Sequence, residues 1–113
     1  LNKPWVGASW EGWAIGQILD HLETAGKSYQ AYHLRTNDQH EIDLVLEYAN
    51  RLWTFEIKLT SVPDRSDLQR LKSTAATVKA DRCILVSRTS QLSEGNRESS
   101  LNLSANVDLL LSE

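Results

Sequence analysis

The sequence predicts an α/β fold in which helices pack against a mixed sheet, and two kinds of periodicity support this. Apolar residues recur at helical spacing in residues 9–25 and again in residues 64–79. Other short segments alternate at period two or form apolar runs of strand length: residues 29–35, 41–48, 52–59 and 82–87. The resulting order is α-β-β-β-α-β. Because a helix precedes the last of these strands, that strand is expected to run parallel to its neighbour.

The first helix is predicted from Ser9 to Ala25, and Gly26 is expected to end it. Glu11 heads its apolar stripe and is therefore expected to point towards the sheet. An alternative is that Ser9 caps the helix, since an acid in the first turn is then favoured by the helix dipole by about 0.3–1 kcal/mol. The rest of the stripe is Ile15, Ile18, Leu22 and Ala25, widened by Trp10, Trp13 and Ala14.

Residues 41–48 and 52–59 are predicted to form a β-hairpin, because two alternating apolar runs flank a turn-like Ala49-Asn50. Residues two apart in a strand share a face, so Glu56 and Lys58 lie together. The opposite face of the same strand carries the apolar side chains Trp53, Phe55, Ile57 and Leu59.

The register of this hairpin decides which residue faces Asp43. A two-residue loop at residues 49–50 places Asp43 directly opposite Glu56, whereas a loop at residues 50–51 places it opposite Lys58. Either register gathers the three charged side chains on one face.

The carboxylates of Asp43 and Glu56 would repel across a strand pair, so folding alone gains nothing from this arrangement. A divalent cation between them would make sense of it, because hard cations take oxygen ligands. Lys58 beside the metal could orient or deprotonate a water, or stabilise charge on a phosphate. The structural alternative is a half-exposed hairpin with a polar outer face, in which Lys58 pairs with either acid.

The remaining segments are predicted as connections and a C-terminal extension. Turns are expected at residues 36–39 and at Glu94-Gly95-Asn96, and a loop at residues 61–64. Leu101 and Leu103 alternate like a last short strand. The apolar tail at residues 107–111 would be costly to expose, so it either packs on this domain or meets a partner.

The composition bounds the class of protein. With 113 residues, 41% of them hydrophobic, the chain suits one domain with a modest core. No apolar run approaches the roughly 20 residues of a membrane span, and there is no secretory signal. Cys83 is the single cysteine and is predicted as a small buried hydrophobe, which favours a reducing cytoplasm. The net charge of −3 excludes a polycation that binds nucleic acid by charge alone.

Helix-borne Glu11, strand-borne Asp43 and the Glu56-x-Lys58 pair resemble the PD-(D/E)xK motif of the nuclease superfamily with a restriction-endonuclease-like fold. The wider pattern resembles the C-terminal domain of unknown function that follows the ATPase module in many bacterial and archaeal AAA-type ATPases. This resemblance extends from about Val6 to Leu111, although Ile42 stands where the motif has proline before the aspartate. Four segments carry it: Val6 to Gly12, Leu34 to Thr36, Glu41 to Glu47 and Trp53 to Lys58.

The resemblance implies Mg²⁺-dependent hydrolysis of phosphodiester bonds in nucleic acid, with DNA the expected substrate. Asp43 and Glu56 would hold Mg²⁺ or Mn²⁺ with the Ile57 carbonyl, and Glu11 would bind the metal directly or through water. Lys58 would position the attacking water. Residues 1–113 would form a single nuclease-like domain, a C-terminal fragment of a longer protein whose N-terminal ATPase domain is the expected partner.

Three further residues are candidates for holding nucleic acid. Arg35 could bind a phosphate as a bidentate donor, or could be a solvated charge at a strand end. Gln69 and Lys72 lie near the start of the second predicted helix, where an anion could be held, or are simply surface residues. Two other functions stay open: a catalytically idle version of the fold used for regulation or protein docking, and a self-contained metal-binding domain of other chemistry.

Overall fold

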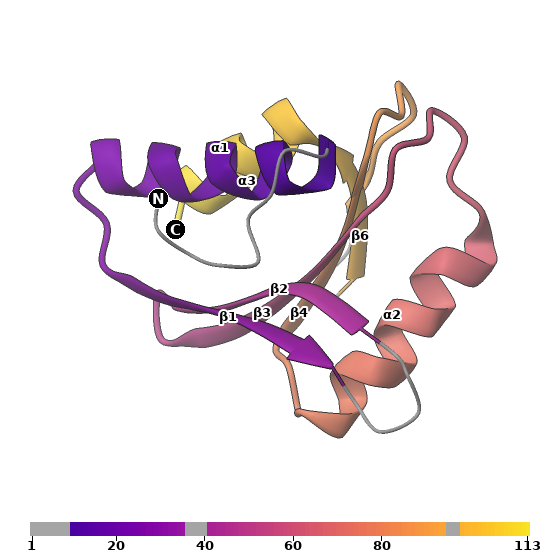
Figure 1. Cartoon of the computed structure of the whole chain (residues 1–113), viewed down its shortest axis with the longest axis horizontal. Coiled ribbons are helices and arrows are strands. Elements are labelled where there is room, and N and C mark those ends of the chain that lie inside the picture. Colours follow the sequence, from indigo (N-terminus) through magenta and orange to yellow (C-terminus); the bar gives the residue numbers. More distant parts are fainter. Residues whose placement is uncertain (1–9, 36–40, 95–97) are drawn as a thin grey trace.

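The computed structural model describes residues 10–35, 41–94 and 98–113, and it confirms the α/β class (Figure 1). In these residues a mixed six-stranded sheet has the order β1-β2-β3-β4-β6-β5. The elements in chain order are α1 (Trp10–Thr24), β1 (Tyr29–Arg35), β2 (Glu41–Tyr48), β3 (Arg51–Ile57), α2 (Arg65–Thr77), β4 (Arg82–Ser87), β5 (Ser93–Glu94), β6 (Glu98–Asn102) and α3 (Leu103–Leu111). No helix in the described ranges is long and apolar enough to cross a membrane.

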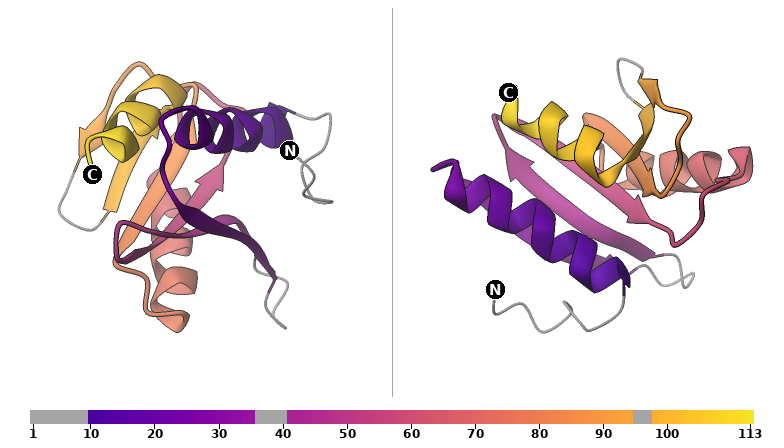
Figure 2. Two further views of the ribbon diagram at one scale, coloured as in Figure 1. Left: turned by 90° about the vertical axis from the view of Figure 1, so that its left-hand side faces the viewer. Right: turned by 90° about the horizontal axis from the view of Figure 1, so that it is seen from above.

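The sheet separates two helical layers (Figures 1 and 2). Helices α1 and α3 lie side by side on one face, and α2 covers the other. The larger core fills the α1 and α3 side, where β3 contributes Trp53, Phe55 and Ile57. A smaller core beneath α2 consists of Leu71, Ala75, Ala80, Cys83 and Leu85. Cys83 is therefore buried, as predicted.

The β2–β3 hairpin has the two-residue loop at Ala49 and Asn50. Both loop residues have positive φ, 54° and 61°, as the tightest hairpin turns require. Tyr48 pairs with Arg51, and the ladder runs on to Leu44 opposite Phe55, so the next step brings Asp43 into line with Glu56. The first of the two predicted registers is confirmed, and the loop at residues 50–51 is wrong.

Helix α1 ends as predicted at Gly26, whose φ is +72°. The amides of Gly26 and Lys27 donate back to the carbonyls of Glu23 and Leu22, at 3.0 and 2.9 Å, which satisfies the last turn. The prediction that Trp13 widens the buried stripe is wrong, because its side chain is 51% exposed. Trp13 lies two residues before Ile15, about 200° around the helix, and so faces away from the sheet. Ala25 is also exposed, one residue beyond the helix.

Strand β3 stops at Ile57, so the prediction that Leu59 continues its apolar face is wrong. Leu59 lies in the following loop and is 56% exposed. Asp64 caps α2 at the expected place, although the helix ends at Thr77 rather than near Lys79. Strand β4 runs parallel to β3, as predicted from the intervening helix.

The C-terminal segment differs from its prediction in one respect. Leu101 lies in β6, but Leu103 begins α3 rather than continuing a strand. The change follows from Asn102, whose side chain caps the helix by accepting a hydrogen bond from the Ala105 amide at 2.9 Å. The apolar tail packs on this domain, since Val107 and Leu110 are buried. The turns predicted at residues 36–39 and 94–96 fall largely outside the described residues.

Candidate functional site

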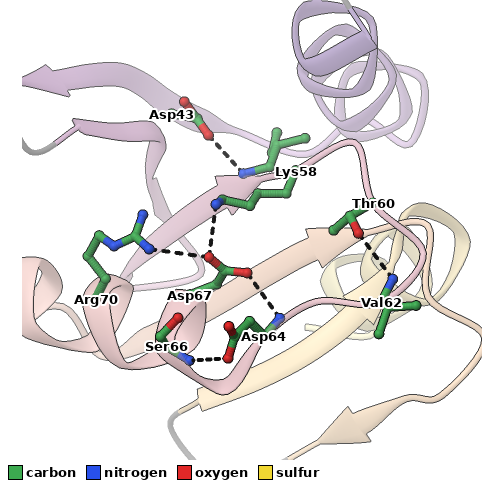
Figure 3. Close-up of polar contacts among 9 residues, drawn as sticks. Asp43, Lys58, Thr60, Val62, Asp64, Ser66, Asp67 and Arg70 are labelled. Carbon is green, nitrogen blue, oxygen red and sulfur yellow. Dashed lines mark hydrogen bonds and ion pairs between the residues drawn. The ribbon is translucent and has the colours of Figure 1, made fainter.

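Asp43, Glu56 and Lys58 meet where β2 begins and β3 ends, on the side of the sheet that α2 covers, and the charges of Asp43 and Lys58 both act on Glu56. Figure 3 shows Asp43 and Lys58 at this place. The neighbours of Glu56 in β3, Phe55 and Ile57, are buried against α1 and α3, so strand alternation turns Glu56 to the α2 side. The Ile57 amide donates to Asp43 Oδ2 at 2.8 Å, which fixes the Asp43 carboxylate beside the end of β3. The structure therefore brings these three predicted site residues together.

The Glu56 carboxyl group lies in an unfavourable environment for its charge. Burial is the main cause that raises its pKa, and the neighbouring Asp43 raises it further, against opposing effects of Lys58 and Arg70. Its Oε2 atom is buried and accepts no hydrogen bond within the part of the chain that the structure describes. A buried acceptor without a partner, next to a second carboxylate, is an arrangement that a bound cation would relieve.

These residues fit a magnesium or manganese ion better than a metal held entirely by side chains. In residues 10–35, 41–94 and 98–113, no three His, Cys, Asp or Glu side chains gather closely enough to hold an ion by themselves. Mg²⁺ is commonly bound through one or two carboxylates and keeps several waters. Asp43 and Glu56 supply such a pair, and the Ile57 carbonyl is the adjacent backbone oxygen.

Lys58 pairs with an acid that the sequence analysis did not single out. Its Nζ atom lies 2.8 Å from Asp67 Oδ1, whereas the structural alternative gave it Asp43 or Glu56 as its partner. Arg70 Nη2 lies 3.3 Å from the same oxygen. Figure 3 shows Lys58, the residue after the end of β3, and Arg70 of α2 converging on Asp67. Asp67 and Arg70 are thus additional members of the site.

These contacts favour the ionised form of Asp67. The hydrogen bond from Lys58 is the main cause that lowers its pKa, and it outweighs the raising effect of burial. One signal for Asp67 was present in the sequence: Asp64-x-x-Asp67 has the spacing of a capping box, and the box is formed. That signal indicates a helix start but does not indicate a lysine partner nine residues earlier.

The other predicted site residues lie apart from this cluster. Glu11 is half-buried on α1, the helix on the opposite face of the sheet, and it is not among the charges that shift the pKa of Glu56. Gln69 is exposed on α2. Lys72 forms an ion pair with Glu98 at 3.1 Å beside a pocket of about 340 Å³. Arg35 ends β1, and its side chain is outside the described part of the structure.

The fold and this cluster define a mixed α/β domain with a carboxylate pair and a lysine at the ends of two central strands. Residues 6–105 match the family described as "Domain of unknown function (DUF4143)", and the chain belongs to that family. It is also similar to the uncharacterized proteins Rv2008c of Mycobacterium tuberculosis and Mb2031c of Mycobacterium bovis, at 39% identity over 69 residues in each. The match covers 61% of this chain and 15% of each relative, so the chain corresponds to a small part of their length. A search of solved structures found no significant match.

Replacing Glu56 with glutamine is expected to stabilise the metal-free protein by about 1 kcal/mol at neutral pH. Because the pKa of Glu56 is raised in the folded state, the stability that its protonated form contributes is present at low pH and is lost as the pH rises through that pKa. The difference between Glu56→Gln and wild type should therefore shrink towards pH 4. Urea unfolding at neutral pH and at pH 4, in the presence of a chelator, measures this difference in the free energy of unfolding. Glu47→Gln, on the exposed side of β2, should change little, and a Glu56→Gln variant less stable than wild type at pH 7 would contradict the expectation.

Proposed function

We propose that this domain binds Mg²⁺ or Mn²⁺ between Asp43 and Glu56 and hydrolyses phosphodiester bonds in nucleic acid, with DNA the expected substrate. One observation carries the proposal: Glu56 holds a buried, unpartnered carboxylate oxygen beside a second carboxylate. A protein gains no stability from such a pair, whereas a cation site requires it.

Each residue of the cluster has a defined role in this proposal. Asp43 and Glu56 would supply carboxylate oxygens, and the Ile57 carbonyl would supply a third oxygen. When bound, the ion would supply Lewis acidity and lower the pKa of a coordinated water. Lys58 provides the positive charge that orients the attacking water or donates to a phosphate oxygen.

The charges around the carboxylates support an enzyme that acts on an anion. Lys58 and Arg70 both lower the pKa of Glu56, so positive charge borders the acidic pair. Arg35, Gln69 and Lys72 are the proposed contacts for the remainder of the nucleic acid. We further propose an N-terminal ATPase domain as the partner and a cytoplasmic location, as the family resemblance and the single cysteine suggest.

The burial of the C-terminal tail weakens the alternative that this fold serves as a protein-docking domain. An exposed apolar patch at residues 109–111 would favour it, but Leu110 is 1% exposed and Leu109 and Leu111 pack partly against the larger core. The tail is therefore used within the domain, which removes one of the surfaces that a docking module would offer.

Calorimetric titration with Mn²⁺ tests the proposed metal site. The wild type is expected to bind about one ion per chain, and the double variant Asp43→Asn, Glu56→Gln to bind none, because both changes remove the anionic ligands. A matched control is Asp81→Asn with Glu47→Gln. Asp81 Oδ2 also accepts a backbone hydrogen bond, from the Leu52 amide at 2.7 Å, but lies outside the cluster.

Cleavage assays on single- and double-stranded DNA and RNA complete this test. Mn²⁺-dependent cleavage by the wild type and the control, absent in the double variant, is the expected result. A wild type that binds no Mn²⁺, or a double variant that binds and cleaves like the wild type, would contradict the proposal.

A further inference from the structure

The ion pair of Lys58 with Asp67 ties the end of β3 to the first turn of α2. The Lys58 side chain is 36% exposed and that of Asp67 only 10%, so the anion is the more deeply held partner. The Lys58 amide also donates to the Val86 carbonyl at 2.9 Å, which anchors the backbone on β4. The flexible four-carbon side chain of Lys58 is thereby held at its backbone and at its ammonium group.

Asp67 is itself held rigidly, because its two oxygens have different partners. Oδ2 accepts the Asp64 amide at 3.0 Å and closes the capping box of α2. Oδ1 accepts Lys58 at 2.8 Å and Arg70 at 3.3 Å. Since Oδ2 is locked to the helix start, Oδ1 has a fixed direction. The position of the Lys58 ammonium group therefore depends on where α2 begins.

We propose that Asp67 is a positioning residue, which holds the Lys58 ammonium group in place beside Asp43 and Glu56. This inference rests on the proposed function and adds α2 to the machinery of the reaction. An unrestrained lysine loses side-chain entropy when it is fixed. Asp67 imposes that order before the substrate arrives, so it acts on the rate through Lys58 and contacts neither metal nor phosphate.

Asp67→Asn is the informative variant, because the amide oxygen can still accept the Asp64 amide while the negative charge opposite Lys58 is lost. We expect kcat for Mn²⁺-dependent DNA cleavage to fall about 10–100-fold, with KM and Mn²⁺ affinity unchanged. Asp81→Asn is the structural control. It removes the charge of another carboxylate that accepts a backbone amide, that of Leu52 at 2.7 Å, but leaves the Lys58–Asp67 pair and the start of α2 intact.

A double-mutant cycle with Lys58→Met separates positioning from a general structural effect. If Asp67 acts through Lys58, Asp67→Asn has no further effect on kcat in the Lys58→Met background. Asp67→Glu, which keeps the charge, should retain more of kcat than Asp67→Asn and serves as the second variant if the asparagine variant does not fold.

The outcomes distinguish failure of this inference from failure of the proposed function. A wild type that does not cleave overturns the proposed function, and this inference with it. If the wild type cleaves DNA and Asp67→Asn has the same kcat as the wild type, only this inference is overturned. The inference is also overturned if Asp81→Asn loses as much kcat as Asp67→Asn, or if Asp67→Asn loses as much kcat in the Lys58→Met background as in the wild type. A third contradicting result is a kcat of Asp67→Glu no higher than that of Asp67→Asn.

Discussion

Replacing Trp53 with alanine is expected to lower the free energy of unfolding by about 3–5 kcal/mol. The Trp53 side chain is completely buried in the larger core, and its Nε1 donates to the Tyr48 carbonyl at 3.0 Å. The Arg82 guanidinium lies 5.1 Å from the centroid of the Trp53 ring, and the centroids of the Tyr48 and Trp53 rings lie 6.2 Å apart. Alanine would leave a cavity and would also take away the ring that faces the Arg82 charge.

Urea unfolding of Trp53→Ala and Trp13→Ala provides a matched comparison of the same chemical change. Trp13 is 51% exposed, so its variant should remain within about 0.5 kcal/mol of wild type. A loss of 3–5 kcal/mol is a large part of the roughly 5–15 kcal/mol of a typical domain. If Trp53→Ala is unfolded without urea, Trp53→Phe gives the smaller, measurable loss. Similar losses for Trp53→Ala and Trp13→Ala would contradict the packing described for β3.

Replacing Lys58 with methionine is expected to lower kcat for Mn²⁺-dependent DNA cleavage by about 10²–10³-fold. Methionine keeps most of the length and the apolar stem of the lysine side chain but removes its positive charge beside Asp43 and Glu56. The Mn²⁺ affinity should not fall, because Lys58 is not a ligand and its removal makes the site more negative. Single-turnover cleavage and calorimetry measure the two quantities separately.

Lys27→Met is the control for Lys58→Met. Lys27 Nζ donates to the Glu113 carbonyl at 3.4 Å, and Lys27 is not among the charges that shift the pKa of Glu56. Its loss should therefore leave kcat unchanged. Equal cleavage by wild type and Lys58→Met would remove Lys58 from the proposed mechanism. A parallel loss of kcat and Mn²⁺ binding would instead mean that the lysine supports the structure of the metal site.

The hairpin that carries Asp43 and Glu56 was largely predictable because its determinants are local. Period-two alternation assigned the strand faces. Of the two registers that the sequence left open, the structure has the one with the loop at Ala49-Asn50, which brings the two carboxylates into line. Helix α1 ended at the predicted glycine for a similar reason, since a left-handed residue is required at one place. Parallel pairing of β4 followed from the helix that precedes it.

Predictions failed where two patterns competed or where the phase of a helix mattered. The alternation of Leu103 with Leu101 predicts a strand, but the Asn102 cap begins a helix at Leu103. The hydrophobicity of Trp13 predicts a place in the apolar stripe, although its angular position on α1 turns it to the surface. In both cases a local rule outweighed an apparent apolar pattern.

The sequence by itself determined the fold class and the gathering of Asp43, Glu56 and Lys58 on one face, because these depend on neighbours along the chain. It left two hairpin registers open, and the structure has the one with the loop at Ala49 and Asn50. Only the tertiary structure decided that Lys58 pairs with Asp67 and that Glu11 lies on a helix across the sheet. Those relations depend on the face on which each helix packs and on its rotation about its own axis. Burial of the two cores sets both quantities, and no short sequence pattern encodes them.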